Sequence, residues 1–231
     1  MNLVLLFDDD FVSAGVVLLT DRRAEHIARV HRAGEGDALA AGLANGQIGS
    51  GTITKMTNDT VEMSVTLTAD PPPALPLTLI LALPRPKVLN RVIASATSLG
   101  VKEIHLINAW RVEKSYWKSP KLTDENLREQ CVAGLEQARD TVFPRITLHR
   151  FFRQFVETFS SEALKLVAHP HAAADCPRNV NVPVALAIGP EGGFIAEEIA
   201  SFERSGFRAV TVGERILRVE TAVAALIARL Y

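Results

Sequence analysis

The chain has 231 residues, of which 48% are hydrophobic, so it can bury one large core or two smaller ones without disulfides or metals. Its two cysteines, Cys131 and Cys176, lie far apart and in no CxxC spacing, which excludes a disulfide framework and a zinc site, and every apolar run is far shorter than the roughly 20 residues of a membrane helix. The net charge is −1, but residues 1–70 hold 5 Lys and Arg against 10 Asp and Glu, whereas residues 71–231 hold 20 against 16. We expect a soluble, unexported, cytoplasmic protein that meets any polyanion through residues 71–231.

Residues 1–70 show the pattern of short strands joined by tight turns. Alternate positions from Val61 to Leu67 are apolar, and Asn45-Gly46 lies between two strand-like stretches, as in a tight hairpin turn. Within this region only Arg22–Arg32 has a helical pattern. We therefore predict a small β-barrel-like domain over residues 1–70.

A proline-rich segment follows this region. Prolines fill four of the eight positions of Ala69–Pro76, which excludes a helix or an inner strand and predicts a linker at residues 71–76. Residues 77–231 then alternate between two patterns. Strands are expected at Leu77–Leu83, Glu103–Ile107, Ile146–His149, Leu164–His169, Val182–Gly189 and Phe207–Gly213. Helices are expected at Lys87–Leu99, Thr123–Thr141, Gln154–Ser161 and from about Glu220 to the end. This alternation predicts a mostly parallel sheet with helices on both faces.

The segment Ile188-Gly189-Pro190-Glu191-Gly192-Gly193-Phe194 lies where a buried strand is expected to end and a helix to begin. Its glycines let the backbone take positive φ angles and approach a ligand closely, at the carboxyl end of parallel strands where α/β proteins bind ligands. The segment matches neither GxGxxG nor GxxxxGK[ST], which argues against dinucleotide and phosphate-loop chemistry. A tight strand-to-helix turn without a ligand remains the alternative.

A second segment, Val212 to Ala222, repeats this arrangement one strand later. The apolar pair Ile216-Leu217 stands inside a charged loop, where it suits packing against a flat adenine. The alternative is a solvated charged turn in which Glu220 favours the positive end of the last helix.

Together the two segments, IGPEGGF and VGERILRVETA, resemble the ribosomal RNA small subunit methyltransferase E family of the SPOUT superfamily, whose members methylate N3 of uracil in 16S ribosomal RNA. The likeness extends over most of the chain. It includes LALPRPKVLNRVIASATSLGVKEIHLI, Arg111, Gly134-Leu135-Glu136-Gln137, Pro144, and the Gly36-Asp37 turn with the hairpin after it.

The resemblance implies an N-terminal PUA-like β-barrel at residues 1–70 and a SPOUT-type methyltransferase domain at residues 77–231, whose last segment forms a trefoil knot. It implies that S-adenosylmethionine binds in three loops of that knot and that the enzyme is a homodimer. Carried over by position, the cofactor residues are Ala168, His169, Pro170, Gly189, Pro190, Glu191, Gly192, Gly193, Val212, Gly213, Ile216, Leu217, Arg218 and Thr221.

Methylation of uridine N3 needs a group that steadies negative charge and a group that takes the proton. Arg218 is the candidate for the first role, and Glu191 and Glu220 are the candidates for the second. The candidate RNA contacts are Arg111, Lys114, Trp117, Gln137 and Arg139. Trp110 and Trp117 stand among cations as in single-stranded RNA sites, although a half-buried loop with solvated lysines explains them equally well.

The chain departs from the family pattern at several places outside the cofactor loops. Ser95 and Ser98 replace a lysine and a glutamate, Asp140 stands where the family commonly has an arginine, and Ile195 replaces a small hydroxyl residue that would cap the next helix. Losing such a cap costs about 1 kcal/mol. These departures touch the choice of RNA rather than the chemistry.

The expected function is S-adenosylmethionine-dependent methylation of 16S ribosomal RNA in the small ribosomal subunit, at N3 of a uridine in the decoding region. Methylation of another RNA nucleotide and non-catalytic RNA binding are the alternatives, whereas an α/β hydrolase is disfavoured because no GxSxG segment is present. His169-Pro170-His171 supplies too few ligands for a metal, so none is expected.

Overall fold

The computed structural model describes residues 2–57 and 59–231 and divides into two compact units. Met1 and Asn58, which belong to the predicted first domain, lie outside the described residues. The first unit contains the residues up to Pro73 together with Val132–Phe143, and the second contains Ala74–Cys131 and Pro144–Tyr231. Residues 132–143, which were predicted to lie in the second domain, group with the first unit in the structure.

The first unit contains a sheet with the strand order β1-β4-β5-β6-β3-β2. Its strands are β1 (Val4–Leu6), β2 (Phe11–Ser13), β3 (Val16–Leu19), β4 (Ala38–Leu43), β5 (Ile48–Met56) and β6 (Val61–Ala69). β1 and β4 are parallel and the other neighbours are antiparallel. The predicted hairpin is confirmed, because Asn45 has a φ of 57° in the turn between the antiparallel strands β4 and β5.

The first unit differs from the predicted elements in two ways. The helix expected at Arg22–Arg32 is an α-helix only over α1 (Arg22–His26) and continues as a wider π-type turn at Ile27–His31. Val132 and Leu135 join this unit because they are buried with Leu3 and Leu5 in a separate apolar cluster. Sequence periodicity marked them as helical but could not show which core they enter.

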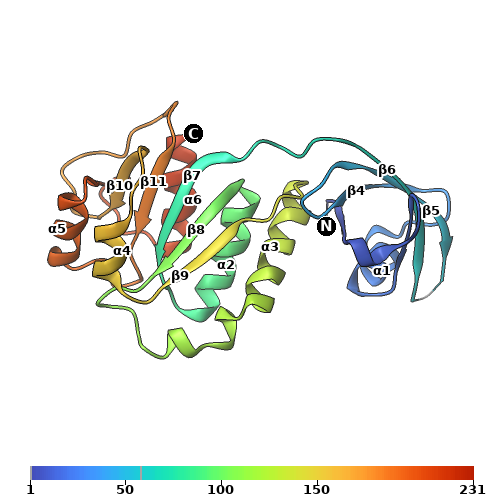
Figure 1. The fold of residues 1–231 in the computed structure, drawn as a ribbon, viewed down its shortest axis with the longest axis horizontal. Helices are drawn as coiled ribbons and strands as arrows, with labels where there is room; N and C mark the ends of the chain where they lie inside the picture. The colour runs from blue at the N-terminus through green and yellow to red at the C-terminus, as the bar shows by residue number, and fades with distance from the viewer. Residues whose placement is uncertain (1, 58) are drawn as a thin grey trace. The chain divides into compact units, whose positions relative to one another are not determined.

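The second unit is built on a parallel sheet with the order β12-β10-β11-β7-β8-β9 (Figure 1). Its strands are β7 (Leu75–Ala82), β8 (Val101–Ile107), β9 (Arg145–His149), β10 (Leu164–Ala168), β11 (Val184–Ile188) and β12 (Arg208–Val210). Its helices include α2 (Pro86–Ser98), α4 (Phe152–Thr158), α5 (Ala196–Arg204) and α6 (Val219–Leu230), while α3 (Asp124–Ala138) begins in this unit and ends in the first. The predicted parallel sheet is confirmed, but its inner strand β7 begins at Leu75 and contains Pro76, so the proline-rich segment does not exclude an inner strand at its end.

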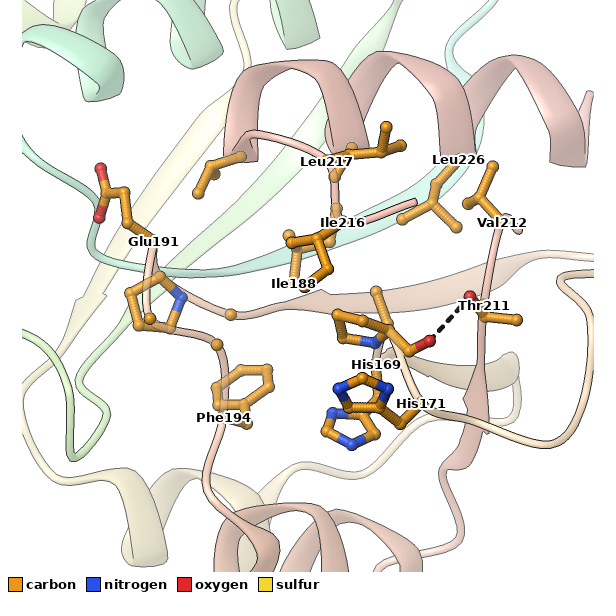
Figure 2. Close-up of a pocket in the computed structure, with 18 of the residues that line it drawn as sticks. His169, His171, Ile188, Glu191, Phe194, Thr211, Val212, Ile216, Leu217 and Leu226 are labelled. Atoms are coloured by element: carbon orange, nitrogen blue, oxygen red, sulfur yellow. Dashed lines mark hydrogen bonds between the residues drawn. The ribbon is translucent and has the colours of Figure 1, made fainter. Parts of the chain in front are cut away.

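Helices cover both faces of this sheet. α2 and α6 pack together on one face, and α4 and α5 pack together on the other, as Figure 2 shows around the ends of the strands. Every residue of the central strand β11 is buried, which explains its uninterrupted apolar sequence. The apolar face predicted for the last helix is also confirmed, because Val219, Val223, Leu226, Ile227 and Leu230 are buried in α6.

Several elements are shorter than their sequence patterns predicted, and local geometry explains where they end. β12 ends at Val210 because the Thr211 side chain hydrogen-bonds into the turn that follows. α3 ends at Ala138 because Arg139 takes a left-handed φ of 55° and buried Asp140 accepts a hydrogen bond from the Val142 N–H. No helix within residues 2–57 and 59–231 combines the length and apolar character needed to cross a bilayer.

Candidate functional site

A cavity of about 330 Å³ lies at the carboxyl ends of β10, β11 and β12 (Figure 2). Three loops surround it: Ala168–His171 after β10, Gly189–Phe194 after β11, and Thr211–Leu217 after β12. The first turns of α6 close it through Val219, Ala222 and Leu226. Parallel strands present their carboxyl ends at one edge of the sheet, where α/β proteins bind small molecules.

The loop after β11 is packed so closely that glycine is required. A Cβ atom at Gly189 would lie 2.9 Å from the backbone nitrogen of Phe194, and Gly193 has a φ of 70°. The Gly193 N–H donates to the Pro190 carbonyl at 2.7 Å, which closes the turn. The prediction of a positive φ is thus confirmed at Gly193, while Gly189 is needed for close contact.

The Arg85 backbone and the Arg111 side chain, both from distant segments, hold this loop. The Glu191 carboxylate accepts a hydrogen bond from the Arg85 backbone N–H at 2.9 Å, and Arg85 is the residue that caps α2. The Arg111 guanidinium donates to the Gly192 carbonyl. In Figure 2 the Glu191 carboxylate points away from the middle of the cavity. The β11 loop is therefore fixed by the rest of the second unit.

The loop after β12 is exposed by comparison. Gly213 has a φ of 146°, and the Thr211 hydroxyl donates to the Gly213 carbonyl at 3.0 Å. The Ile216 side chain lines the cavity and is 74% exposed, so it lies at the mouth. Arg218 is exposed, and its carbonyl accepts from the Ala222 N–H at the start of α6. Within the part of the chain that the structure describes, the Arg218 side chain forms no ion pair.

The cavity brings together most of the predicted cofactor residues. Those that line it are Ala168, His169, Pro170, Gly189, Pro190, Glu191, Gly192, Gly193, Val212, Ile216 and Leu217. The predicted residues outside its lining are Gly213, Arg218, Thr221 and Glu220. Glu220 instead pairs with Arg91 of α2, with 3.5 Å between Oε1 and Nη1. The assigned roles of all these residues stay predictions.

Other residues that were not predicted from the sequence also line the cavity. They are His171, Ile188, Phe194, Val210, Thr211, Arg215, Val219, Ala222 and Leu226, and the predicted RNA contact Arg111 lines it too. The spacing of Val219, Ala222 and Leu226 on one face of α6 was a usable signal, because residues three and four apart share a helix face. The remaining ones adjoin predicted residues at the strand ends.

The two histidines that line the cavity lie next to each other. The ring centroids of His169 and His171 are 5.8 Å apart. Burial lowers the pKa of His169, and the neighbouring His171 lowers it further, so His169 is neutral at pH 7. Among the described residues no group of three or more His, Cys, Asp or Glu side chains is placed to hold a metal ion.

The predicted RNA contacts fall in different parts of the chain. Lys114 and Trp117 line a second hollow near the ends of β8 and β9, whereas Gln137 and Arg139 are exposed in the segment that groups with the first unit. The Trp117 ring is buried and its Nε1–H donates to Asn108 at 3.0 Å. Trp117 therefore supports its own loop and offers no free face to a base.

The departures from the family pattern have local roles in the structure. The Ser98 hydroxyl donates to the Ser95 carbonyl within α2. The Ile195 side chain cannot cap α5, as expected, but the Ile195 N–H donates to the buried Glu198 carboxylate at 3.0 Å. Glu198 thus compensates in part for the missing cap, which the sequence analysis did not foresee.

Comparisons with known proteins identify the family of the chain. The sequence model of the family described as RNA methyltransferase domain matches residues 71–231. The chain is 33% identical over 239 residues to the ribosomal RNA small subunit methyltransferase E of Treponema pallidum, covering 97% of this chain and 88% of that protein. It is 27% identical over 221 residues to the Synechocystis protein of the same name, covering 93% and 72%.

A solved structure resembles the whole chain. The ribosomal RNA small subunit methyltransferase E from Neisseria gonorrhoeae, bound to S-adenosyl methionine, is 25% identical, with a TM-score of 0.77 over 99% of this chain and 95% of that one. The family model, the sequence likeness to the named relatives and the shared fold all agree. The chain therefore belongs to the ribosomal RNA small subunit methyltransferase E family and is an RNA methyltransferase.

Proposed function

We propose that this chain methylates N3 of a uridine in the decoding region of 16S ribosomal RNA. S-adenosylmethionine is the cofactor of the reaction, and ribosomal RNA is its substrate. The observation that carries the proposal is the cavity in which the three predicted cofactor loops meet at the ends of β10, β11 and β12. Work on ribosomal RNA also favours a cytoplasmic location.

The lining of the cavity suits S-adenosylmethionine. Ile188, Leu217 and Leu226 give apolar surface for a flat adenine, and Gly189, Gly192 and Gly193 add backbone without side chains to the wall beside it. His169 is neutral and adds no positive charge next to a cation. The apolar lining therefore suits the flat face of adenine, and the neutral His169 suits a neighbouring sulfonium.

The reaction requires charge control at the uracil. When bound, S-adenosylmethionine supplies an electrophilic methyl group. Uridine N3 carries a proton, so it becomes a good nucleophile only after deprotonation or strong polarisation. Arg218 is our candidate for stabilising the developing N3 anion, because its side chain is exposed beside the cavity and has no ion-pair partner among the described residues.

Two carboxylates remain candidates for handling the proton. The Glu191 carboxylate accepts a hydrogen bond from the Arg85 backbone, and the Glu220 carboxylate forms an ion pair with Arg91. Either carboxylate must weaken or break that interaction in order to accept a proton from uracil. The Arg91 guanidinium is 64% exposed, so that ion pair is easily exchanged for water. We therefore favour Glu220, which lies two residues beyond Arg218.

We also propose the architecture that the resemblance implies: a PUA-like barrel at 1–70, a linker from residue 71, a knotted SPOUT domain and a homodimer. The structure changes two of the bounds, because β7 begins at Leu75 within the predicted linker 71–76, and Val132–Phe143 of the predicted domain 77–231 group with the first unit. The outward side of α6 supports the dimer, because Thr221, Ala224 and Ala228 are exposed and small enough for close helix packing. Ile216 adds an exposed apolar side chain nearby. Light scattering of the purified chain tests this proposal, and a monomer with full activity would contradict it.

The decisive experiment has two parts. Calorimetry measures whether S-adenosylmethionine binds at about one site per chain. Mass spectrometry then compares the small-subunit ribosomal RNA of a strain lacking the gene with that of the parent strain, and we expect loss of one N3-methyluridine that returns with the gene. Loss of a different methylated nucleotide would show that the chain is an RNA methyltransferase with another target nucleotide. Absence of cofactor binding would favour a non-catalytic RNA-binding protein.

A further inference from the structure

The second hollow of the methyltransferase unit is a groove beside the cofactor cavity. It is formed by the loop after β8, the start of α4 after β9, and one side of α5. Because β8 and β9 run parallel to β10, β11 and β12, all these loops lie at the same edge of the sheet. The groove and the cavity are thus open on the same side of one unit.

Positive side chains from three separate segments line this groove. Lys114 and Lys118 come from the loop after β8, Arg150 and Arg153 from the start of α4, and Arg204 from the end of α5. The acidic residues in the lining are Glu197 and Glu198. The Glu198 carboxylate is buried and accepts hydrogen bonds from the backbone N–H groups of Trp110 and Ile195. Five cations from separate elements are therefore opposed by one exposed carboxylate, which suits a polyanion.

An exposed aromatic ring lies in the same groove. Trp110 is 79% exposed, although its backbone N–H is fixed by the Glu198 carboxylate at 2.7 Å. A large ring held at its backbone and left open to solvent is a ready surface for stacking a base. By contrast, Trp117 is buried, and the Arg150 guanidinium lies over its ring at 5.3 Å, so Arg150 also stabilises the wall of the groove.

The groove adjoins the cofactor cavity through two shared segments. Arg111 follows Trp110 directly and lines the cavity, where it donates to the Gly192 carbonyl. Ile195 lines the groove, and its neighbour Phe194 lines the cavity. A strand that delivers a nucleotide to the cavity would pass over these residues and place its neighbouring nucleotides in the groove.

We propose that this groove binds a single-stranded segment of the substrate RNA next to the target nucleotide. The phosphates follow the lysine and arginine side chains, and one flanking base stacks on Trp110. Single-stranded RNA is favoured over a duplex because a stacking platform needs an unpaired base. The inference rests on the proposed function, since it names the surface that would guide RNA to the same site.

The test measures binding of a fluorescein-labelled oligouridine of about twelve nucleotides at salt concentrations from about 50 to 200 mM. We expect Arg153→Ala and Arg204→Ala each to weaken binding severalfold and to reduce the slope of log affinity against log salt by about 0.7 to 1. We expect Trp110→Ala to weaken binding about fivefold or more with the slope unchanged, and Trp110→Phe to retain most of the affinity. These residues are exposed, so the variants should fold.

The controls separate the groove from the proposed function. Arg208→Ala removes an exposed arginine of β12 outside the groove and should leave oligouridine binding unchanged. S-adenosylmethionine affinity should stay normal in every groove variant. Equal oligouridine binding by wild type and groove variants, no binding by wild type, or equally strong binding of a duplex would each overturn the groove. Failure of wild type to bind S-adenosylmethionine or transfer a methyl group would instead overturn the proposed function, independently of the oligouridine result.

Discussion

The loops after β11 and β12 look alike in sequence but differ in how the chain supports them. Both follow a strand end, contain glycine and lead into a helix. The β11 loop is clamped by Arg85 and Arg111, and its Phe194 packs against Phe152 and Phe202. The β12 loop exposes Gly213 through Ile216 and holds itself mainly through the Thr211 hydroxyl.

This difference assigns different tasks to the two sides of the cavity. A loop with partners on its outer side keeps its shape before a ligand arrives, and such preorganisation reduces the cost of binding. A loop with exposed side chains has groups left to engage a substrate or a second protein chain. We infer that the β11 loop mainly shapes the cofactor site and that the β12 loop mainly meets the other reactant.

The strongest test of this comparison is Arg218→Ala. We expect turnover to fall on the order of a hundredfold or more, because the guanidinium is proposed to act only as charge develops on uracil. Cofactor affinity and the melting temperature should stay near wild type, since Arg218 is exposed and forms no ion pair within the described residues. Turnover, calorimetry and thermal melting on the same protein measure all three.

Arg218→Lys is the matched control, because it keeps the charge and loses the planar guanidinium. Partial recovery of turnover in this variant would support charge stabilisation. If Arg218→Ala lowered cofactor affinity and melting temperature together, the β12 loop would be a structural element like the β11 loop, and the comparison would fail.

Gly192→Val tests the β11 loop and should weaken S-adenosylmethionine binding tenfold or more. A Cβ atom at Gly192 would lie 2.8 Å from Arg111 Cδ, so the added side chain must displace Arg111 or turn the loop into the cavity. Calorimetry measures the loss. The double variant with Arg111→Ala removes the steric conflict, so recovered binding would show that the loop clamp matters, and persistent loss would show that valine occupies the cofactor's space.

A smaller effect is expected for Glu191, which separates a structural role from a catalytic one. Its carboxylate accepts from the N–H of Arg85, so Glu191→Ala should lower stability by about 1 kcal/mol, as for a lost helix cap, and leave turnover within a fewfold of wild type. Denaturant unfolding and methyl-transfer assays measure the two effects. Glu220→Gln is the comparison, because we expect the larger loss of turnover there.

The outcome at these carboxylates decides between our two candidates for the proton acceptor. A hundredfold loss of turnover in Glu191→Gln, with stability and cofactor binding intact, would restore Glu191 as the base and remove Glu220. Equal, small losses in both variants would mean that neither carboxylate takes the proton.

The site was predictable from sequence to the extent that its residues lie close along the chain. The glycines of Gly189–Gly193 and the apolar face of α6 follow from local rules about turns and helix periodicity, and both were predicted. The contact of Glu191 with Arg85 joins residues 106 positions apart, so no local pattern could indicate it. Likewise, nothing in the sequence distinguished the exposed Trp110 from the buried Trp117.

The loop after β10 is the third loop of the cavity, and we expect the smallest effect on cofactor binding there. Burial lowers the pKa of His169, so this ring is neutral in the folded chain at pH 7 and resists protonation more than in the unfolded chain. Stability contributed by the neutral ring is therefore present above the ordinary histidine pKa of about 6.5 and is lost as pH falls below it toward the lower folded value.

Protonated His169 would also repel the sulfonium, so we expect cofactor affinity to fall about threefold between pH 7 and pH 5, a small change because the ring is partly solvated. His169→Asn should flatten this pH dependence, with His171→Asn as the control on the neighbouring ring. Calorimetry across that range measures both, and a pH profile identical in wild type and His169→Asn would show that the β10 loop, like the β11 loop, contributes shape rather than charge.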